Sequence, residues 1–313
     1  MFVPEAVPDR TLTPSGDAAS RRGLPVLAPL ETLYETKRGR TLPLPPELAR
    51  LYGRLRMPLE RSRPHVISNF VTTLDGVVSL NAKGHASGGD ISGFSTQDRM
   101  VMGLLRAIAD AVIVGAGTLS IDRHHVWTAE RIFPGLADEY RRLRAMLGKP
   151  APPLNVIVSG SGRVDLGLPV FASGEAPALI VTTAEGEKRL RKQRAPASVE
   201  IRAVRRSASA TRGNASTIRS SSILEQVGRR FQVGAGKLIL VEGGPRLLGA
   251  FYAEHALDEQ FLTLAPQIAG RDAGDRRLSL VIGRTFAPRR PLWGTLIDLR
   301  RGGSHLFLRY SFP

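Results

Sequence analysis

The sequence predicts an α/β fold with a mixed, mostly parallel central sheet that is flanked by helices. Short apolar runs of strand length alternate with helical patterns from residue 65 to residue 255, which favours parallel strands with helices on both faces. After residue 257 the chain holds strand-like runs without helices, which indicates antiparallel strands added at one edge of the same sheet.

Residues 1–60 are predicted to be an extension of the main domain, which spans residues 61–313. Prolines are dense in the extension, and no apolar period persists before residues 46–52, where a short helix with proline in its first turn is expected. Ahead of that helix we expect a mostly irregular arm that wraps the body or a partner subunit.

The main domain is expected to be a regular succession of strands and helices. β-Branched runs bounded by turn residues predict strands, and apolar residues at helical spacing predict helices. The expected strands are 65–74, 111–114, 154–159, 178–182, 199–204 and 237–242, and the expected helices are 96–109, 136–147, 185–194, 221–232 and 246–255. Residues 207–217, rich in serine and arginine, are predicted to be a mobile loop.

The composition excludes several classes of protein. The 313 residues include no cysteine, which excludes disulfides, thiolate zinc sites and a cysteine nucleophile. The apolar runs are too short to cross a bilayer, and the first residues lack the features of a secretory signal. The histidines complete no metal-binding spacing, and no Gly-x-Ser-x-Gly motif marks a hydrolase. We therefore expect a cytoplasmic protein with no metal and no membrane partner.

The net charge of +16 indicates either solvated basic faces or an anionic partner. Cations are dense in residues 188–194 and between residues 202 and 230. No aromatic residues interleave with the first cluster, so stacking on single-stranded bases is poorly supported and no nucleic-acid partner is expected. A regulatory protein that binds nucleic acid through this region is kept as an alternative.

The first candidate site is a strand that runs into two glycines. The apolar run 237–241 is followed by Glu242, Gly243, Gly244 and Pro245, and then by a helix. Residues without a Cβ let backbone N–H groups approach a diphosphate, and the helix dipole favours its negative charge. The carboxylate of Glu242 would repel phosphate, so we expect it to accept hydrogen bonds from a ring or an amine. A plain glycine turn is the alternative.

The second candidate site follows the strand 111–114. Gly115, Gly117 and Thr118 supply backbone donors and one hydroxyl, and Asp122 lies one turn further on. The dinucleotide fingerprint Gly-x-Gly-x-x-Gly fails here, because Ser120 occupies the place of the third glycine and no suitable acidic residue follows on a second strand. Asp122 as an ordinary loop residue is the alternative.

The third candidate site is the strand 65–74, where small polar side chains alternate until the turn at Asp75 and Gly76. Polar groups on a central strand need partners, and a bound ligand is one way to provide them. Arg106, on the helix before the second site, is placed to clamp a substrate phosphate. A surface ion pair is the alternative for this arginine.

In this order the three segments resemble the reductase domain of bacterial riboflavin biosynthesis, over residues 63–313. The marks are Thr73-Leu74-Asp75-Gly76, Leu105-Arg106-Ala107, Val114-Gly115-Ala116-Gly117-Thr118, Val241-Glu242-Gly243-Gly244-Pro245 and Pro266-Gln267-Ile268-Ala269-Gly270. The resemblance implies a dihydrofolate reductase-like fold, NADPH as cofactor, and hydride transfer to 5-amino-6-(5-phosphoribosylamino)uracil, a small phosphorylated heterocycle. It also implies a homodimer.

The resemblance assigns roles to individual residues. It places Thr118 and Asp122 at the nicotinamide end of NADPH beside the Gly115–Gly117 turn, and Ser159 and Arg163 near the adenosine 2′-phosphate. The phosphates would be held by the turn Gly243, Gly244, Pro245, Arg246, Leu247 and Leu248. The residues facing the substrate would be Asn69, Asp75, Arg106 and Glu242. Asp75 and Glu242 are the candidate proton donors, with water as the alternative.

Three departures from the family pattern lie toward the substrate end. Val77 stands where many members carry lysine or arginine, Asp122-Arg123-His124 replaces a common Asp-Asp-Pro, and residues 89–93 replace a serine-tryptophan element. The cysteine ligands of the zinc deaminase domain that is fused to many homologues are missing as well. Reduction of another heterocycle, such as a pteridine, is therefore a second alternative.

Overall fold

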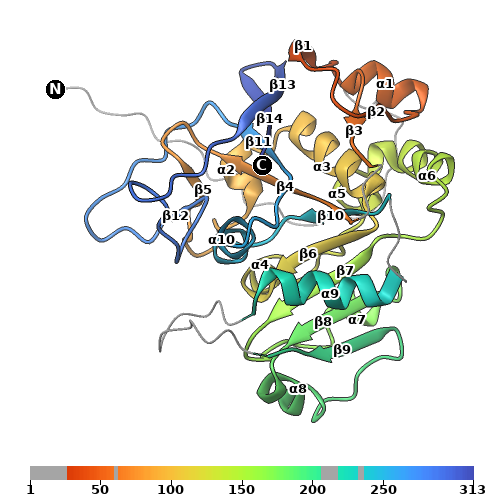
Figure 1. The fold of residues 1–313 in the computed structure, drawn as a ribbon, viewed down its shortest axis with the longest axis vertical. Helices are drawn as coiled ribbons and strands as arrows, with labels where there is room; N and C mark the ends of the chain where they lie inside the picture. Colours follow the sequence, from red (N-terminus) through yellow and green to blue (C-terminus); the bar gives the residue numbers. More distant parts are fainter. Residues whose placement is uncertain (1–26, 60–62, 206–217, 232–235) are drawn as a thin grey trace, which may run out of the picture.

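The computed structural model describes residues 27–59, 63–205, 218–231 and 236–313, and most of its strands form one sheet (Figure 1). This sheet has 10 strands in the order β1-β13-β14-β11-β4-β10-β6-β7-β8-β9. Strands that are far apart in the sequence are neighbours at its centre, because β10 returns to lie between β4 and β6. The predicted loop 207–217 lies outside the described residues.

The larger part of the sheet is parallel, as the alternation of strands and helices predicts. It consists of β11 (Glu259–Leu264), β4 (His65–Thr72), β10 (Leu238–Val241), β6 (Ala111–Gly115), β7 (Leu154–Ser159), β8 (Ala178–Thr182) and β9 (Val199–Ala203). Every neighbouring pair among them runs parallel. Val112, Ile113 and Val114 of β6 are fully buried, as expected for a parallel strand that is covered on both faces.

The expected antiparallel strands are found at one edge. β14 (His305–Ser311) pairs antiparallel with β11, and β13 (Thr295–Gly302) pairs antiparallel with β14. The outermost strand is β1 (Glu31–Glu35), which pairs antiparallel with β13. The prediction of a mixed sheet with antiparallel C-terminal edge strands is therefore confirmed.

Helices cover both faces of the sheet, which gives the fold two apolar cores. Ile67 of β4 shares one core with α1 (Pro46–Tyr52), α3 (Thr96–Ile108), α5 (Ala129–Ile132), α6 (Ala137–Met146), α7 (Pro169–Ala172) and α8 (Ala184–Leu190). Val66 shares the other core with α9 (Ser220–Phe231) and α10 (Pro245–Ala253). Successive residues of a strand point to opposite faces, so these two neighbours belong to different cores.

Short elements complete the fold. They are α2 (Gly88–Ser92), α4 (Ala116–Ile121), the 3-10 turn η1 (Pro134–Leu136), the pair β5 (Val77–Ser79) with β12 (Leu278–Ser279), and the pair β2 (Arg40–Thr41) with β3 (Arg56–Met57). In Figure 1, α2, α4, β5 and β12 lie on the left, where the parallel strands end. Among the described helices, none has the length and apolarity that a membrane crossing requires.

The segment 27–59 is more ordered than the irregular arm that its prolines predict. The helix 46–52 is confirmed as α1, but β1 was not expected, and it forms the edge of the main sheet. Leu48 and Leu51 of α1 are at most 1% exposed and belong to the same core as Ile67. The division of the chain at residue 60 stays a prediction, although this part of the extension shares its packing with the main domain.

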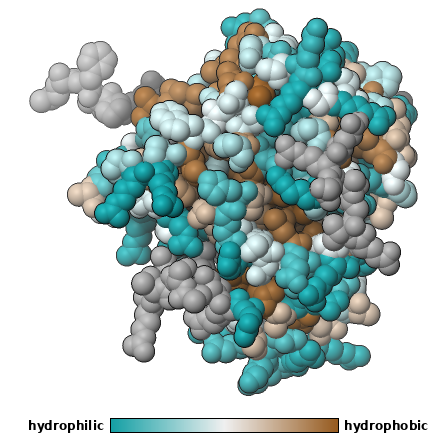
Figure 2. Space-filling view, in the orientation of Figure 1, coloured by the Kyte–Doolittle hydropathy of each residue, from teal (hydrophilic) through white to brown (hydrophobic). Residues whose placement is uncertain are grey.

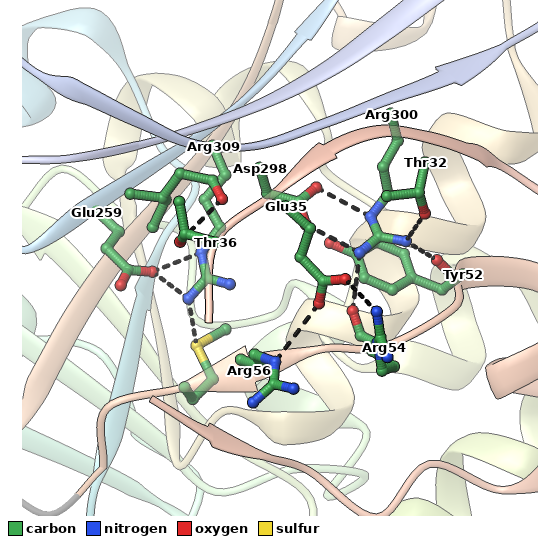
Figure 3. Close-up of polar contacts among 12 residues, drawn as sticks. Thr32, Glu35, Thr36, Tyr52, Arg54, Arg56, Glu259, Asp298, Arg300 and Arg309 are labelled. Atoms are coloured by element: carbon green, nitrogen blue, oxygen red, sulfur yellow. Dashed lines mark hydrogen bonds and ion pairs between the residues drawn. The ribbon is translucent and has the colours of Figure 1, made fainter. Parts of the chain in front are cut away.

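Buried arginines attach the segment 27–59 to the sheet (Figure 3). Arg300 of β13 donates to both carboxylate oxygens of Asp298, at 2.9 and 2.8 Å, and also to the carbonyl oxygens of Tyr52 and Arg54. A guanidinium that leaves water needs such acceptors on every side. The position of α1 is therefore fixed by polar contacts as well as by apolar packing.

Candidate active site

The candidate residues gather at the carboxyl edge of the parallel strands. Val241, the last residue of β10, lies beside Ser68 of β4 on one side and beside Ile113 of β6 on the other. Helices α10 and α4 begin directly after β10 and β6, so the two glycine turns meet at one place. In open α/β sheets, ligands bind at this end of the strands.

The two glycines after β10 have different roles. A Cβ on Gly243 would lie 2.5 Å from the Cα of Val114 and 2.6 Å from the backbone nitrogen of Gly115, so this glycine allows the turn to pack on β6. Gly244 has a φ of +59°, in the left-handed region that favours glycine. A Cβ there would meet only the Oγ1 of Thr118, at 3.8 Å. The side of Gly244 that lacks a Cβ therefore faces α4.

The first turn of α10 offers fewer free donors than the sequence suggests. The backbone N–H groups of Leu247 and Leu248 donate to the carbonyl oxygen of Gly244, at 3.0 and 3.1 Å. Pro245 has no N–H to offer. The helix thus uses both of these donors itself, and the expected phosphate contacts of Leu247 and Leu248 stay a prediction. Gly244 and Arg246 stay proposed phosphate contacts.

Two glycines at the start of α4 leave the backbone uncovered. Gly115 is the residue before α4, Gly117 is its second residue, and a Cβ on either would meet no atom within 4 Å. Thr118 follows on the same turn, beside Gly244. The turns after β6 and β10 together present a surface of backbone, here called the glycine surface, formed by Gly115, Gly117 and Gly244.

A buried ion pair lies at the same edge of the sheet. Nε of Arg106 donates to Oε2 of Glu242 at 2.9 Å, and the two side chains are 2% and 3% exposed. Another guanidinium nitrogen lies 2.6 Å from Nε2 of His125 and donates to the carbonyl oxygen of Thr128 at 3.3 Å. Protein acceptors thus already surround the guanidinium of Arg106, and its expected contact with a substrate phosphate stays a prediction.

Glu242 keeps one oxygen without a partner. Its Oε1 is buried and makes no hydrogen bond with any of the described residues. A buried acceptor that lacks a donor costs about 1–3 kcal/mol, which a ligand N–H or a water molecule would recover. The expectation that Glu242 accepts hydrogen bonds from a ring or an amine is compatible with this arrangement.

Two aspartates near the ion pair hold a proton more tightly than usual. Burial raises the pKa of Asp122, the charge of Arg106 opposes this rise, and the charge of Asp90 adds to it. Burial also raises the pKa of Asp98, at the start of α3. Asp122 thus becomes a candidate proton donor, a role that the sequence did not suggest for it. Asp98 was not singled out, because an acidic residue in the first turn of a helix is common.

The carboxylate of Asp75 joins two loops by hydrogen bonds. Its carboxylate accepts from Oγ1 of Thr73 at 2.5 Å and from the backbone N–H groups of Ala269 and Gly270, at 3.1 and 2.8 Å. These hydrogen bonds, first that of Thr73 and then that of Ala269, lower the pKa of Asp75 to about 2. A carboxyl group that stays ionised at neutral pH is a poor proton donor, which disfavours this candidate role of Asp75; the role stays an untested prediction.

Ser159 and Arg163 flank the loop after β7. Ser159 is 3% exposed and its carbonyl oxygen accepts from Oγ1 of Thr182 at 2.6 Å, whereas Arg163 is exposed. A further cation stands here, because Arg189 of α8 donates to the carbonyl oxygen of Ser161. Arg163 and Arg189 therefore both stand at this loop, which stays the proposed place of an adenosine 2′-phosphate. Sequence reasoning counted Arg189 only within a basic cluster.

Asn69 lies between the sheet and α3. It is 7% exposed and lines a cavity of about 10 Å³ together with Val101 and Thr263. The same cavity is lined by Asp298, a member of the buried cluster around Arg300. The structure therefore places Asn69 toward the antiparallel edge of the sheet, and its contact with a substrate stays a prediction.

The two adjacent histidines differ in their surroundings. His124 is exposed, whereas His125 is partly buried against Arg106 and stacks edge-on against Trp127, with ring centroids 5.2 Å apart. Sequence reasoning set both aside as metal ligands, and no spacing in the sequence indicates the contact of His125 with Arg106. Within the described ranges, no three His, Cys, Asp or Glu side chains gather closely enough to hold a metal ion.

A larger cavity, of about 540 Å³, lies near the amino end of β4 and borders α9. Apolar residues are visible beside α9 at the centre of the face in Figure 2, and the cavity is lined in part by Val66 and Leu224. Its arginines, Arg63 and Arg229, already pair with Asp258 and Glu225. We place the chemistry at the carboxyl edge instead, because that edge combines the glycine surface with the unpartnered oxygen of Glu242.

Comparison with known families gives one match over most of the chain. Residues 64–281 match the family described as the RibD C-terminal domain. Among curated relatives, the 2,5-diamino-6-ribosylamino-4(3H)-pyrimidinone 5′-phosphate reductase of Archaeoglobus fulgidus is 27% identical over 67% of this chain and 84% of its own length. The riboflavin biosynthesis protein RibD of Chlamydia muridarum is 29% identical over 67% of this chain and 48% of its own. This chain thus spans about half of that RibD protein.

Solved structures show the same fold. A pyrimidine reductase-like protein from Corynebacterium diphtheriae covers 85% of this chain and 98% of its own, with a TM-score of 0.62 and 20% identity. The diaminohydroxyphosphoribosylaminopyrimidine deaminase/5-amino-6-(5-phosphoribosylamino)uracil reductase from Thermotoga maritima covers 80% of this chain and 57% of its own, with a TM-score of 0.55 and 21% identity. These likenesses support the dihydrofolate reductase-like fold that the sequence predicts.

Proposed function

Because the chain belongs to the RibD C-terminal domain family, we propose that it is an NADPH-dependent reductase of a phosphoribosylamino pyrimidine, as in riboflavin biosynthesis. The observation that carries the proposal is the glycine surface next to the buried Arg106–Glu242 pair. One part suits an anionic cofactor, and the other offers an acceptor for a substrate amine.

The glycine surface fits the diphosphate of a dinucleotide. Gly115 and Gly117 leave open space where a Cβ would stand, so a ligand can lie directly on the backbone. The N-terminus of α10 points its dipole at the same place, which favours negative charge. We assign Gly115, Gly117, Gly244 and Arg246 to this part of NADPH, and Thr118, which stands beside Gly244, to the adjoining nicotinamide end. Gly243 and Pro245 shape the turn.

Cations near the end of β7 support NADPH over NADH. Arg163 is exposed after Ser159, and Arg189 contacts the same loop, so two guanidinium groups are available to a 2′-phosphate. NADPH, when bound, supplies the hydride. The chain's own residues position the reactants and place charge around them.

Glu242 and Asp122 are the residues that we propose to interact with the substrate. Oε1 of Glu242 receives no hydrogen bond from any residue that the structure describes, so an amino or ring N–H of a pyrimidine would satisfy it. Burial raises the pKa of Asp122, and this direction of shift suits a group that donates a proton, so Asp122 is the proposed proton donor. Val77 is fully buried and paired with Ser279, so it cannot replace the cation that many family members carry there. Arg271, which donates to the carbonyl oxygen of Gly76, is a cation beside this turn.

The experiment is a direct assay of the purified protein with reduced nicotinamide cofactor. We expect NADPH to be consumed when 5-amino-6-(5-phosphoribosylamino)uracil or its diamino-pyrimidinone counterpart is added, with one ribityl product per NADPH. NADH should act much more weakly, because it lacks the 2′-phosphate. Parallel assays with a pteridine test the other heterocycle class.

The outcomes separate the possibilities. If only the pteridine is reduced, the protein is a reductase as proposed, but its substrate is a pteridine and not a pyrimidine. Failure of NADPH to bind, together with a salt-dependent mobility shift on DNA or RNA, would favour the nucleic-acid-binding alternative instead. The homodimer, the cytoplasmic location and the absence of a nucleic-acid partner also stay predictions.

A further inference from the structure

His125 contacts the guanidinium of Arg106, although it is not one of the residues that carry the family resemblance. Its Nε2 lies 2.6 Å from a terminal nitrogen of Arg106. A guanidinium can only donate, so Nε2 must carry the lone pair and the imidazole proton must reside on Nδ1. The contact therefore requires the neutral form of His125 and one particular tautomer.

The loop that carries His125 is anchored to the sheet. Asn155 of β7 is fully buried, accepts from the backbone N–H of Trp127 at 2.8 Å and donates to the carbonyl oxygen of Trp127 at 3.3 Å. The Trp127 ring is 2% exposed and stands edge-on to the imidazole, at an interplanar angle of 80°. A chain of contacts thus runs from β7 through Trp127 and His125 to Arg106, and from there to Glu242.

Arg106 is held from three sides by this arrangement. Glu242 accepts from Nε and from one terminal nitrogen, while His125 and the carbonyl oxygen of Thr128 engage the other. Because the guanidinium is rigid and planar, fixing its far end also fixes the plane in which it meets the carboxylate. Of the two carboxylate oxygens of Glu242, Oε1 is then the one that makes no hydrogen bond with any described residue.

We propose that His125 is a positioning residue of the active site, which orients Arg106 and through it turns the free oxygen of Glu242 toward the substrate. This inference rests on the proposed function and adds a residue to it. In this role His125 acts through Arg106, its hydrogen-bond partner, and not directly on the substrate.

Burial, together with two neighbouring positive charges, keeps the imidazole of His125 neutral near neutral pH. Burial lowers the pKa of His125 to about 3, and the positive charges of Arg106 from α3 and of Arg131 from α5 add to this effect. In the unfolded chain its pKa is near 6.5. Stability from this site is therefore present above pH 6.5 and is lost as the pH falls toward 3, because only the unfolded chain takes up the proton.

The test compares three variants in the full-length protein. His125→Leu removes the acceptor, His125→Gln supplies an amide oxygen in its place, and His124→Leu changes the exposed neighbour as a matched control. We expect His125→Leu to lower kcat/KM for the aminopyrimidine roughly 10- to 100-fold, the usual effect of losing a partner that orients a functional side chain. The loss should fall mainly on kcat, while NADPH affinity and the activities of His125→Gln and His124→Leu stay near wild type.

A spectroscopic measurement covers the case in which His125→Leu does not fold. Nitrogen NMR of the wild-type imidazole should show a protonated Nδ1 and a bare Nε2 at every pH from 8 to 5, with no titration. Titration near pH 6.5, or a folded His125→Leu variant with wild-type kcat/KM, would overturn the proposal. If the wild type reduces no aminopyrimidine at all, the proposed function fails, and the NMR result still decides whether His125 holds Arg106.

Discussion

Replacing Arg106 with methionine is expected to lower the free energy of unfolding by about 3–5 kcal/mol, the usual effect of removing one partner of a buried ion pair. The change leaves the carboxylate of Glu242 buried without its cation, since the two side chains are 2% and 3% exposed. Turnover should be lost as well, because Glu242 is no longer oriented. Chemical denaturation followed by circular dichroism gives the stability, and NADPH oxidation gives the activity.

The double variant Arg106→Met/Glu242→Leu separates stability from function. With both charges removed, apolar side chains of similar volume fill the space, and replacements of this kind are often neutral or stabilising. We expect the double variant to recover much of the lost stability and to remain inactive. If Arg106→Met lowers the free energy of unfolding by less than about 1 kcal/mol, the pair behaves as a solvated surface pair and not as the buried pair described here.

Replacing Gly243 with alanine is expected to destabilise the protein by about 1–3 kcal/mol or more, the range for overpacking a well-packed site. The added Cβ would stand 2.5 Å from the Cα of Val114 and 2.6 Å from the nitrogen of Gly115. Both are backbone atoms, which cannot turn away as a side chain does. The turn after β10 must then shift from β6, and NADPH binding should weaken with it.

Gly115→Ala is the matched control for this prediction of stability. A Cβ there meets no atom within 4 Å, and Gly115 has a φ of −82°, which any residue adopts. Thermal unfolding should therefore show little change for Gly115→Ala and a clear decrease in Tm for Gly243→Ala. Equal Tm values for the two variants would contradict the packing described at the β10 turn.

Local patterns predicted most of the fold, because strands and helices are encoded by nearby residues. The turn at Gly243 and Gly244 and the apolar run before it were sufficient to place β10 and α10. The antiparallel edge followed from the absence of helical spacing after residue 257. β1 was missed, since its partner β13 lies more than 260 residues away and its own side chains are mostly exposed.

The side-chain partners within the site were less accessible to sequence reasoning. Arg106 and Glu242 are 136 residues apart, and they meet only because β10 inserts between β4 and β6. A lone arginine on a helix gives no sign that it is buried, so its pairing with Glu242 and His125 was not foreseen. Asp75 shows the converse. It belongs to a sequence motif that predicts a functional site, but its carboxylate accepts hydrogen bonds from the loop at Ala269 and Gly270.

The diphosphate of NADPH is proposed to lie on the glycine surface, and the substitution Gly117→Ala changes that surface alone. A Cβ at Gly117 meets no protein atom within 4 Å, and alanine favours a helix over glycine by about 1 kcal/mol, so this variant should fold at least as well as the wild type. Ser120→Ala, on the same helix, is the control. We predict that the dissociation constant of NADPH, measured by titration, rises at least about tenfold (1.4 kcal/mol) in Gly117→Ala and stays unchanged in Ser120→Ala. An unchanged dissociation constant in a stably folded Gly117→Ala variant would mean that the diphosphate does not lie on the glycine surface.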